Sequence, residues 1–484
     1  MAADAGTDLV AVKFSRLTRR GVLLGLSATQ LVTVSLGIAI GVVSLYIAGG
    51  TGLVLSSPFL ISLGLLTWVP LGGRKLVEWL PLTGHWLLRT VVRQLGYRRR
   101  IVKPRPAGTL ALPGDGAALR HYDDPESGAV MVHDPHAATL TVVLEVKHPS
   151  FVLLDPADQQ RRVAGWSRVL ATCCRSGRIA RLQVLERTLP DAGAGLTAWW
   201  REHGVDDGSW VAQTYTELVE RAGPVGEQHV TTVSLALDLK AAAREIRSAG
   251  GGLRGAAHVL RQEMATLITA LRSADLTPSP WFTPGDLAVA LRTAYDPAVS
   301  TALQRTSDIG RDLTTAGPLA VEETWDRLRS DSAHHAVLWI SEWPRTQVFP
   351  GFLHPVLLTS GVRRSVTLLC DPLRTDRAAR DIRKRRTEYV SDATQRARLG
   401  QIEDAQQTAE YHDVLQQESD LVAGHGMLRY TGLIALSAPT VDELESVVAQ
   451  LEQAAVQASC ETRRLVGQQA QAFAAAALPL CRPI

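Results

Sequence analysis

The chain has 484 residues, enough for two or three domains, and its 51 basic and 48 acidic residues leave a formal net charge of +3. Residues 1–105 hold thirteen basic and three acidic residues (net +10), whereas the remainder holds 38 and 45 (net −7), which argues against a broad nucleic-acid-binding surface. The five cysteines form no C-x-x-C pair, which argues against a disulfide framework or a zinc site and favours reduced cytosolic thiols.

A long uncharged segment lies near the N-terminus: residues 21–73 contain no Asp, Glu, Lys or Arg. One helix of this length would measure roughly 80 Å, whereas the hydrocarbon core of a bilayer is about 30 Å thick. The sequence AGGTG at 48–52 indicates a break. We therefore predict a transmembrane helical hairpin over 21–73, with spans at about 22–48 and 53–69, rather than a secretory signal.

Basic residues flank the predicted hairpin on both sides, and the turn between its spans is uncharged. The positive-inside rule therefore predicts a two-span protein of the cell membrane. Residues 1–20 form a cytoplasmic N-terminus, and the C-terminus is cytoplasmic too. The basic residues expected at the membrane interface are Arg19, Arg20, Arg74, Lys75, Arg98, Arg99 and Arg100.

Residues 74–105 follow as a basic and aromatic segment that ends in a linker. Trp79 and Trp86 recur with Leu and Val at helical spacing, which is typical of a helix lying in the membrane interface. The nearby arginines would then contact anionic phospholipid, at about 1 kcal/mol for each basic residue. The alternative is a short connecting helix packed on the soluble part.

Gly37 and Gly41 form a G-x-x-x-G pattern inside the first predicted span. Small residues at this spacing allow two helices to approach closely. We expect the two glycines to mediate packing within the hairpin. The alternative is a contact with another membrane subunit.

After the Pro- and Gly-rich stretch at 103–116, strand-like and helix-like segments alternate. We predict strands at 129–134, 139–148, 179–188, 229–239, 335–344, 364–372 and 428–439. We predict helices at 156–176, near the tryptophans at 199–210, at 253–274, 350–361 and 376–423, and at 440–455, where Thr440 or Asp442 can cap the helix.

The order of these segments recurs, which suggests an internal repeat. The predicted fold class is therefore a membrane-anchored α/β (α+β) protein, in which two successive cytoplasmic α/β sandwich units, at 106–300 and 301–484, follow the transmembrane hairpin. The polar stretch 376–423 is predicted to form a long helical hairpin in the second unit. It is either a solvated hairpin or an arm that grips a partner subunit.

No catalytic or cofactor-binding constellation is found in the sequence. The chain contains no Gly-Lys dipeptide, so it lacks the Walker A pattern of P-loop motors. The G-x-G-x-x-G match at Gly250 follows a predicted helix instead of a strand, which favours a break between helices over a dinucleotide site. His133 and His136 flank a turn, His334 and His335 point to opposite faces of a strand, and Glu342 is expected to be structural. We expect no enzyme activity, cofactor or metal.

Two parts of the chain resemble components of conjugative type IV secretion systems. The N-terminal sequences RLTRRGVLLGLSATQL and GGRKLVEWLP resemble the PrgI family of two-span inner-membrane subunits. The sequences WFTPGDLAVALRTAYDP (281–297), RRTEYVSDATQRARLGQ (385–401) and LVGQQAQAFAAAALPL (465–480) resemble the non-motor N-terminal region of the secretion ATPase. Together they resemble an actinobacterial protein type that joins these two parts and leaves out the motor.

This resemblance implies a non-catalytic structural component of a DNA-transfer machine. Its partners would be a separate P-loop secretion ATPase, other secretion-channel subunits and further copies of itself, with no direct binding of nucleic acid. A type VII secretion subunit of the EccE kind is the first alternative, since it too combines a two-span anchor with a cytoplasmic α/β domain. A membrane-anchored transferase is the second alternative.

Overall fold

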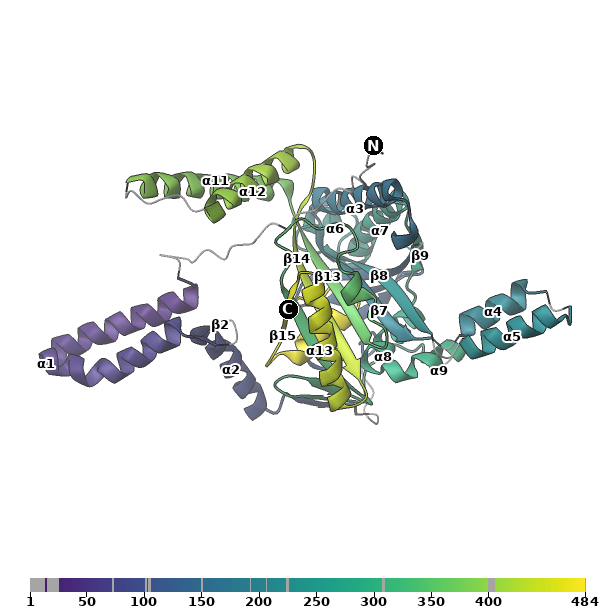
Figure 1. Cartoon of the computed structure of the whole chain (residues 1–484), viewed down its shortest axis with the longest axis horizontal. Helices are drawn as coiled ribbons and strands as arrows, with labels where there is room; N and C mark the ends of the chain where they lie inside the picture. The colour runs from purple at the N-terminus through teal and green to yellow at the C-terminus, as the bar shows by residue number, and fades with distance from the viewer. Residues whose placement is uncertain are drawn as a thin grey trace, which may run out of the picture. The chain divides into compact units, whose positions relative to one another are not determined.

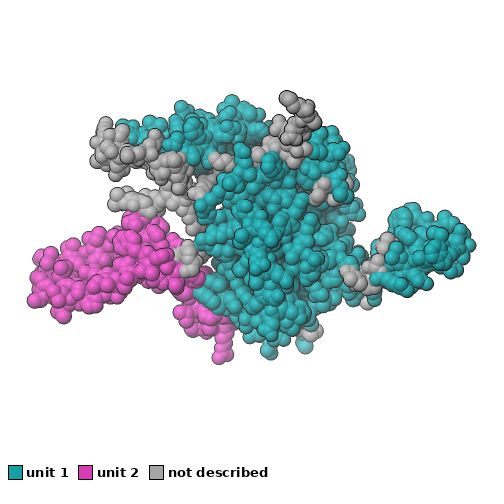
Figure 2. Space-filling model, viewed as in Figure 1, with its two compact units in different colours: residues 1–14, 96–484 teal, residues 15–95 magenta. Residues whose placement is uncertain are grey.

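The computed structural model describes residue 14 and residues 26–71, 74–100, 102, 106–148, 151–191, 193–205, 207–222, 226–306, 310–398 and 405–483. The chain divides into two compact units (Figure 2). The smaller unit comprises residues 15–95 and contains the apolar segment. The larger unit comprises residues 96–484 together with residues 1–14.

The smaller unit is built on one long apolar helical segment, α1 (Ala28–Trp68). Ser27 and Gln30 form a capping box at its start, which satisfies backbone amides that have no helical partner. The backbone leaves helical geometry at Gly49 (φ 59°, ψ −144°), inside the break predicted at 48–52. Only glycine adopts this conformation readily, because it has no Cβ. The remaining elements are β1 (Pro70–Leu71), β2 (Arg74–Lys75) and α2 (Leu76–Val91).

One antiparallel sheet of 13 strands forms the centre of the larger unit (Figure 1). Its strands are β3 (Gly96–Arg98), β4 (Arg120–Asp123), β5 (Val130–Asp134), β6 (Thr139–Lys147), β7 (Ile179–Pro190), β8 (Glu227–Asp238), β9 (Thr277–Trp281), β10 (Ala320–Glu323), β11 (Leu328–Ser330), β12 (Ala333–Glu342), β13 (Arg363–Leu373), β14 (Met427–Ala438) and β15 (Glu461–Arg464). The seven predicted strands correspond to β5, β6, β7, β8, β12, β13 and β14.

Helices of the larger unit cover the sheet or project from it (Figure 1). They are α3 (Pro156–Ser176), α4 (Ala194–His203), α5 (Trp210–Ala222), α6 (Ala243–Ser248), α7 (Gly252–Arg272), α8 (Pro284–Tyr295), α9 (Ser300–Arg305), α10 (His354–Leu357), α11 (Thr375–Arg398), α12 (Ala405–Val422), α13 (Val441–Gln457) and α14 (Gln469–Ala477). Thr440 caps α13, as predicted, by accepting a hydrogen bond of 3.3 Å from the backbone amide of Glu443.

The sheet contains two halves of the same topology. Read outward from the centre, the strand orders are β7-β8-β6-β5 and β13-β14-β12-β11, and β9 pairs with β6 as β15 pairs with β12. A helical hairpin is inserted at the same place in each half, with α4–α5 between β7 and β8 and α11–α12 between β13 and β14. The recurrence of elements in the sequence therefore corresponds to a repeated strand topology.

The prediction of two separate sandwich units at 106–300 and 301–484 is not confirmed. Strands β7 and β13 pair directly, in a register that runs from Arg187–Ser365 to Leu182–Cys370. Each half supplies hydrogen-bond partners for a strand that would otherwise form an exposed edge of the other half. The two halves consequently share one sheet and belong to one compact unit.

Alternating residues of the strands enter hydrophobic cores on opposite faces of the sheet, as the period of two requires. In β14, Leu433 and Ala435 face the core that contains α8 and α14, whereas Ile434 and Leu436 face the core that contains α13. The second face continues over the other half, where α3 and α7 cover it. The larger unit is thus a sheet with helices on both faces.

The C-terminal sequence ALPLC lies buried along the face that carries α14. The side chain of Gln183, in β7, donates to the Leu478 carbonyl at 3.0 Å and accepts from the Cys481 amide at 2.7 Å. Ser234 donates to the Pro479 carbonyl at 2.9 Å, and Thr367 donates to the Ala476 carbonyl at 2.7 Å. Polar side chains of three central strands thereby satisfy the backbone of this segment, which belongs to the core.

Candidate functional site

The apolar helix α1 is the first candidate site, because among the described residues it alone is long and apolar enough to span a membrane. Its two ends contact each other. The Gln30 side chain donates to the Thr67 carbonyl at 2.9 Å, and the hydroxyls of Thr33 and Thr67 lie 3.1 Å apart. These contacts join residues 37 and 34 positions apart in sequence. The segment therefore folds back on itself at Gly49.

The predicted helix-packing glycines differ in their surroundings. A Cβ placed on Gly41 would lie 3.9 Å from Leu60 in the other half of α1, whereas a Cβ on Gly37 would meet nothing within 4 Å. Gly52 is the more restrictive position, since its Cβ would lie 2.2 Å from the Ser44 carbonyl oxygen. The closest approach in α1 therefore involves a glycine outside the G-x-x-x-G pattern.

Lys75 and Trp79, two predicted interface residues, contact other parts of the smaller unit. The ammonium group of Lys75 donates to the side-chain oxygen of Gln30 at 3.0 Å, and the Trp79 indole donates to the Leu71 carbonyl at 3.1 Å. Arg74 pairs with Leu71 in the two-stranded β1–β2 ribbon. Trp86 lies partly buried on α2.

Exposed apolar side chains accompany these residues on α2. Leu80, Leu87, Leu88 and Val91 are all at least half exposed, while the helix also carries Glu78 and Arg89. An amphipathic helix with this composition suits a membrane interface.

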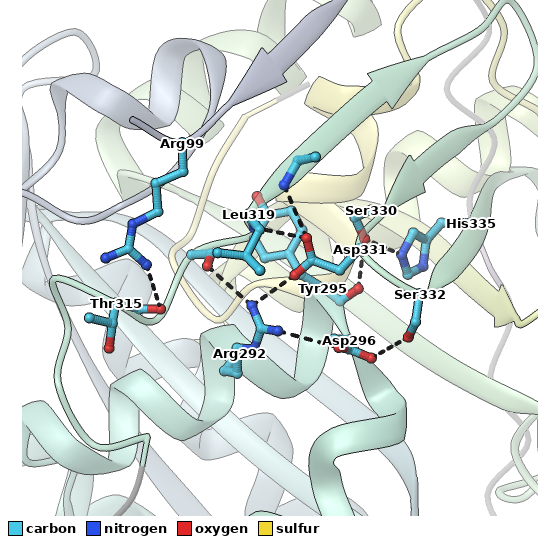
Figure 3. A network of polar contacts seen from close by, with 12 residues as sticks. Arg99, Arg292, Tyr295, Asp296, Thr315, Leu319, Ser330, Asp331, Ser332 and His335 are labelled. Carbon is cyan, nitrogen blue, oxygen red and sulfur yellow. Dashed lines mark hydrogen bonds and ion pairs between the residues drawn. The ribbon is translucent and has the colours of Figure 1, made fainter. Parts of the chain in front are cut away.

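The basic run at 98–100 has two different environments. Arg98 and Arg100 are exposed, whereas Arg99 is partly buried beside β10. The Arg99 backbone amide donates to the Leu319 carbonyl at 2.8 Å, and its guanidinium donates to the Thr315 carbonyl at 3.3 Å (Figure 3). Strand β3 thus attaches this run to the sheet. Arg19 and Arg20 lie outside the described residues.

A buried polar network lies beyond Arg99 and centres on Arg292 of α8 (Figure 3). Arg292 donates to Asp331 at 2.8 Å and to Asp296 at 3.3 Å, and both carboxylate side chains are less than a tenth exposed. Asp331 also accepts from the Leu319 amide at 2.8 Å, and Asp296 accepts from the Ser332 hydroxyl at 2.6 Å. Arg292, Asp296 and Asp331 are thus all paired with an opposite charge. The network joins α8 to β10 and β11, and these three side chains are occupied by one another rather than free to bind a ligand.

His335 forms the second part of this network and is completely buried. Its Nε2 lies 2.6 Å from the Ser330 hydroxyl, which donates to the Tyr295 carbonyl, and its Nδ1 lies 2.8 Å from the Ser437 hydroxyl. Burial lowers the pKa of His335 to about 3, so the imidazole is neutral at physiological pH. The Ser330 hydroxyl donates its proton to the Tyr295 carbonyl and has no access to solvent. Ser330 and His335 therefore form a structural hydrogen-bond chain and are not arranged as a nucleophile and its base.

The other residues considered for chemistry are explained by local structure. Asp134 accepts from the backbone amides of His136 and Ala137, which forms the predicted turn. Gly250 lies between α6 and α7 with a φ of 98°, as expected for a break between helices. Glu342 is partly exposed and pairs with Arg345 at 2.5 Å. Among the described residues, no group of three His, Cys, Asp or Glu side chains could hold a metal ion.

An aromatic socket on the larger unit was missed by the sequence analysis. Phe14 stacks on Trp343 with ring centroids 5.2 Å apart, and it also contacts Phe352 and Tyr430 at 5.5 and 5.9 Å. Gly432 makes room for Trp343, because a Cβ there would lie 2.7 Å from the indole. These residues are scattered through the sequence, so no local pattern indicates the socket.

No protein-family model and no curated protein matches the chain.

Proposed function

We propose that this protein is a non-catalytic structural component of a conjugative type IV secretion machine, held in the inner membrane by two spans and docking a separate P-loop secretion ATPase. The contact of Gln30 with Thr67 across the break at Gly49 is the observation that supports a two-span membrane anchor. The assignment to a secretion machine comes from the sequence resemblance described above.

The lengths of the two halves of α1 support two spans. Residues 28–48 and 50–68 would measure about 32 and 28 Å as helices, and the hydrocarbon core of a bilayer is about 30 Å thick. A continuous 41-residue helix would measure about 60 Å. When α1 folds back, the length of each half matches the thickness of the hydrocarbon core, whereas a straight helix would be about twice too long.

Both flanks of the smaller unit connect to the same larger unit, which supports an even number of spans. Phe14 precedes α1 and contacts the aromatic socket, while β3 follows α2 and joins the sheet. Residues on both sides of α1 thus belong to one compact unit. The positive-inside rule then assigns this unit to the cytoplasm.

The polar clusters of the larger unit support a scaffolding role. Arg292 and both of its carboxylate partners are paired, and His335 is neutral and enclosed. Internally satisfied networks of this kind rigidify a domain. In the proposed function such a domain would present surfaces to an ATPase and to other channel subunits.

Accessibility of introduced cysteines tests the topology. The five native cysteines are buried, so they give a low background. In intact cells, a membrane-impermeant thiol reagent should label Gly50→Cys, whereas the exposed positions Val102→Cys and Val422→Cys should react only after lysis. Labelling of Val102→Cys from outside would overturn the two-span arrangement.

Affinity purification tests the function. The tag should follow residue 484 on a flexible linker, because Leu478, Leu480 and Cys481 are buried. We expect mass spectrometry of the membrane complex to identify a P-loop ATPase together with conjugation proteins. Repeated recovery without an ATPase would refute the proposal, and recovery with small secreted helical substrates would instead favour a subunit of the EccE kind.

A further inference from the structure

Two helical hairpins project from equivalent places in the two halves of the sheet, α4–α5 after β7 and α11–α12 after β13 (Figure 1). The registers show that they leave from opposite ends of the central strand pair. Leu182 near the start of β7 lies beside Cys370 near the end of β13, and Arg187 lies beside Ser365. The two points of departure are about one strand length apart, roughly 35 Å.

The α4–α5 hairpin has a small core of its own and an apolar outer surface. Trp200 packs on Tyr215 with centroids 4.4 Å apart and donates to Thr216 at 3.1 Å, which pins the two helices together. Trp210 and Val211, in contrast, are 77% and 68% exposed. Large apolar side chains exposed together on a surface indicate an interaction site, and tryptophan is the residue type most enriched at binding hot spots.

Acidic residues accompany this apolar surface. Residues 194–222 contain Arg201 and Arg221 but five acids, which gives a net charge of −3. Glu217 lies seven positions after Trp210 and therefore on the same face of α5. Glu217 and Glu220 are both exposed.

Helix α11 presents the complementary surface. It carries eight basic and four acidic residues, a net charge of +4. Ile382 and Tyr389 pack toward Val414 and Tyr411 of α12, so the opposite face of α11 points outward. The exposed residues of α11 include Arg377, Arg380, Arg383, Lys384 and the apolar Val390, whereas Arg386 pairs with Glu418 of α12.

We propose that the α4–α5 hairpin of one copy docks on the outer face of α11 of a second copy. The acids of α5 face the arginines of α11, and Trp199 and Trp210 supply ring faces on which guanidinium groups stack. The proposal goes beyond the proposed function and does not depend on it.

The geometry of the arms excludes closure of this contact within one chain. The arms leave from opposite ends of the β7–β13 strand pair, so each copy offers one α4–α5 surface and one α11 surface to other copies. Such a contact therefore joins different copies, either reciprocally in a two-fold dimer or head to tail in a ring or an open chain.

Charge reversal in the full-length protein in detergent tests the contact, with mass photometry as the measurement. Glu217→Arg with Glu220→Arg, and separately Arg380→Glu with Arg383→Glu, should each weaken association about tenfold or more. Arg244→Glu with Arg247→Glu is the matched control for the α11 variant, because it makes the same charge change on exposed residues of α6. These positions are exposed, so thermal unfolding of each variant should remain within a few degrees of the wild type.

Mixing the two variants tests whether the α4–α5 surface of one copy meets the α11 surface of another. The α5 variant retains an intact α11 surface, and the α11 variant retains an intact α4–α5 surface. In the mixture the two intact surfaces can meet, and the two reversed surfaces are again opposite in charge. An equimolar mixture should therefore associate more strongly than either variant alone. A mixture that stays monomeric, or variants that associate like the wild type, would overturn the proposal. Binding of the protein to anionic vesicles through α11, without any association between copies, would also overturn it.

Discussion

Gln30 donates a hydrogen bond of 2.9 Å to the backbone carbonyl of Thr67, 37 residues later in the chain. The same side chain accepts from Lys75 at 3.0 Å and completes the capping box of Ser27. One amide thus joins the start of α1, its end and the strand that follows. A polar contact of this kind is worth about 0.6–1.7 kcal/mol between membrane helices.

Gly52 is expected to be essential for the fold-back of α1. Gly52→Ala would place a Cβ 2.2 Å from the Ser44 carbonyl oxygen, so the two halves must separate. We expect the unfolding temperature of the protein in lipid nanodiscs to fall by several degrees. Gly50→Ala is the control, because a Cβ there meets nothing within 4 Å. Equal stability of the two variants would contradict the turn described here.

Phe14 is expected to stabilise the larger unit although it lies far away in sequence. Phe14→Ala removes ring contacts with Trp343, Phe352 and Tyr430, which should lower the free energy of unfolding by about 1–3 kcal/mol. Phe349→Ala is the matched control, since that ring is 54% exposed. Urea denaturation of both variants measures the difference, and an unchanged midpoint for Phe14→Ala would argue against the socket.

His335 is expected to make stability fall in mild acid. Its pKa is about 3 in the folded protein and about 6.5 when unfolded, so the unfolded state binds the proton first. The contribution is present in full above pH 6.5 and is lost as pH falls toward 3, with about 2 kcal/mol lost by pH 5.

His335→Gln should lower stability at pH 7.5, because it breaks the contacts with Ser330 and Ser437, and should also flatten the decline between pH 6.5 and 5. The control His258→Gln changes an exposed histidine of α7. Chemical denaturation at several pH values gives both slopes. The same slope in His335→Gln as in the wild type would show that the imidazole is not the titrating group.

Arg292 is expected to be critical for the stability of the buried network. Arg292→Met leaves the carboxylates of Asp296 and Asp331 buried without their common partner, which should cost about 3–5 kcal/mol. Arg311→Met is the control, because Arg311 is half exposed and lies 3.8 Å from Asp286. A loss below 1 kcal/mol for Arg292→Met, measured by urea denaturation, would be inconsistent with this network.

The main elements of the fold could be predicted from the sequence because each has a local signature. The break in the apolar segment follows from the glycines at 48–52, and Gly49 is the residue that leaves helical geometry. The cap of α13 follows from Thr440. Strands β3, β10 and β15 were not predicted, because three or four residues are too few to display a period of two.

The candidate sites were predicted less completely. The interface role of the basic run at 98–100 stays a prediction, and the contact of Arg99 with Thr315, more than two hundred positions later, was not predicted. The network of Arg292 and the socket of Phe14 were not predicted at all. Their members come from segments that are distant in sequence, and composition shows no sign of their proximity.

The sequence by itself therefore determined the apolar segment with its break, the alternation of strands and helices and the repetition of their order, because hydrophobic period, glycine and capping residues act over a few positions. Only the tertiary structure decided that both halves share one sheet through β7 and β13, and that α4–α5 and α11 leave this strand pair from opposite ends. These features depend on which strand edges meet, and pairing between edges is a property of the folded chain as a whole.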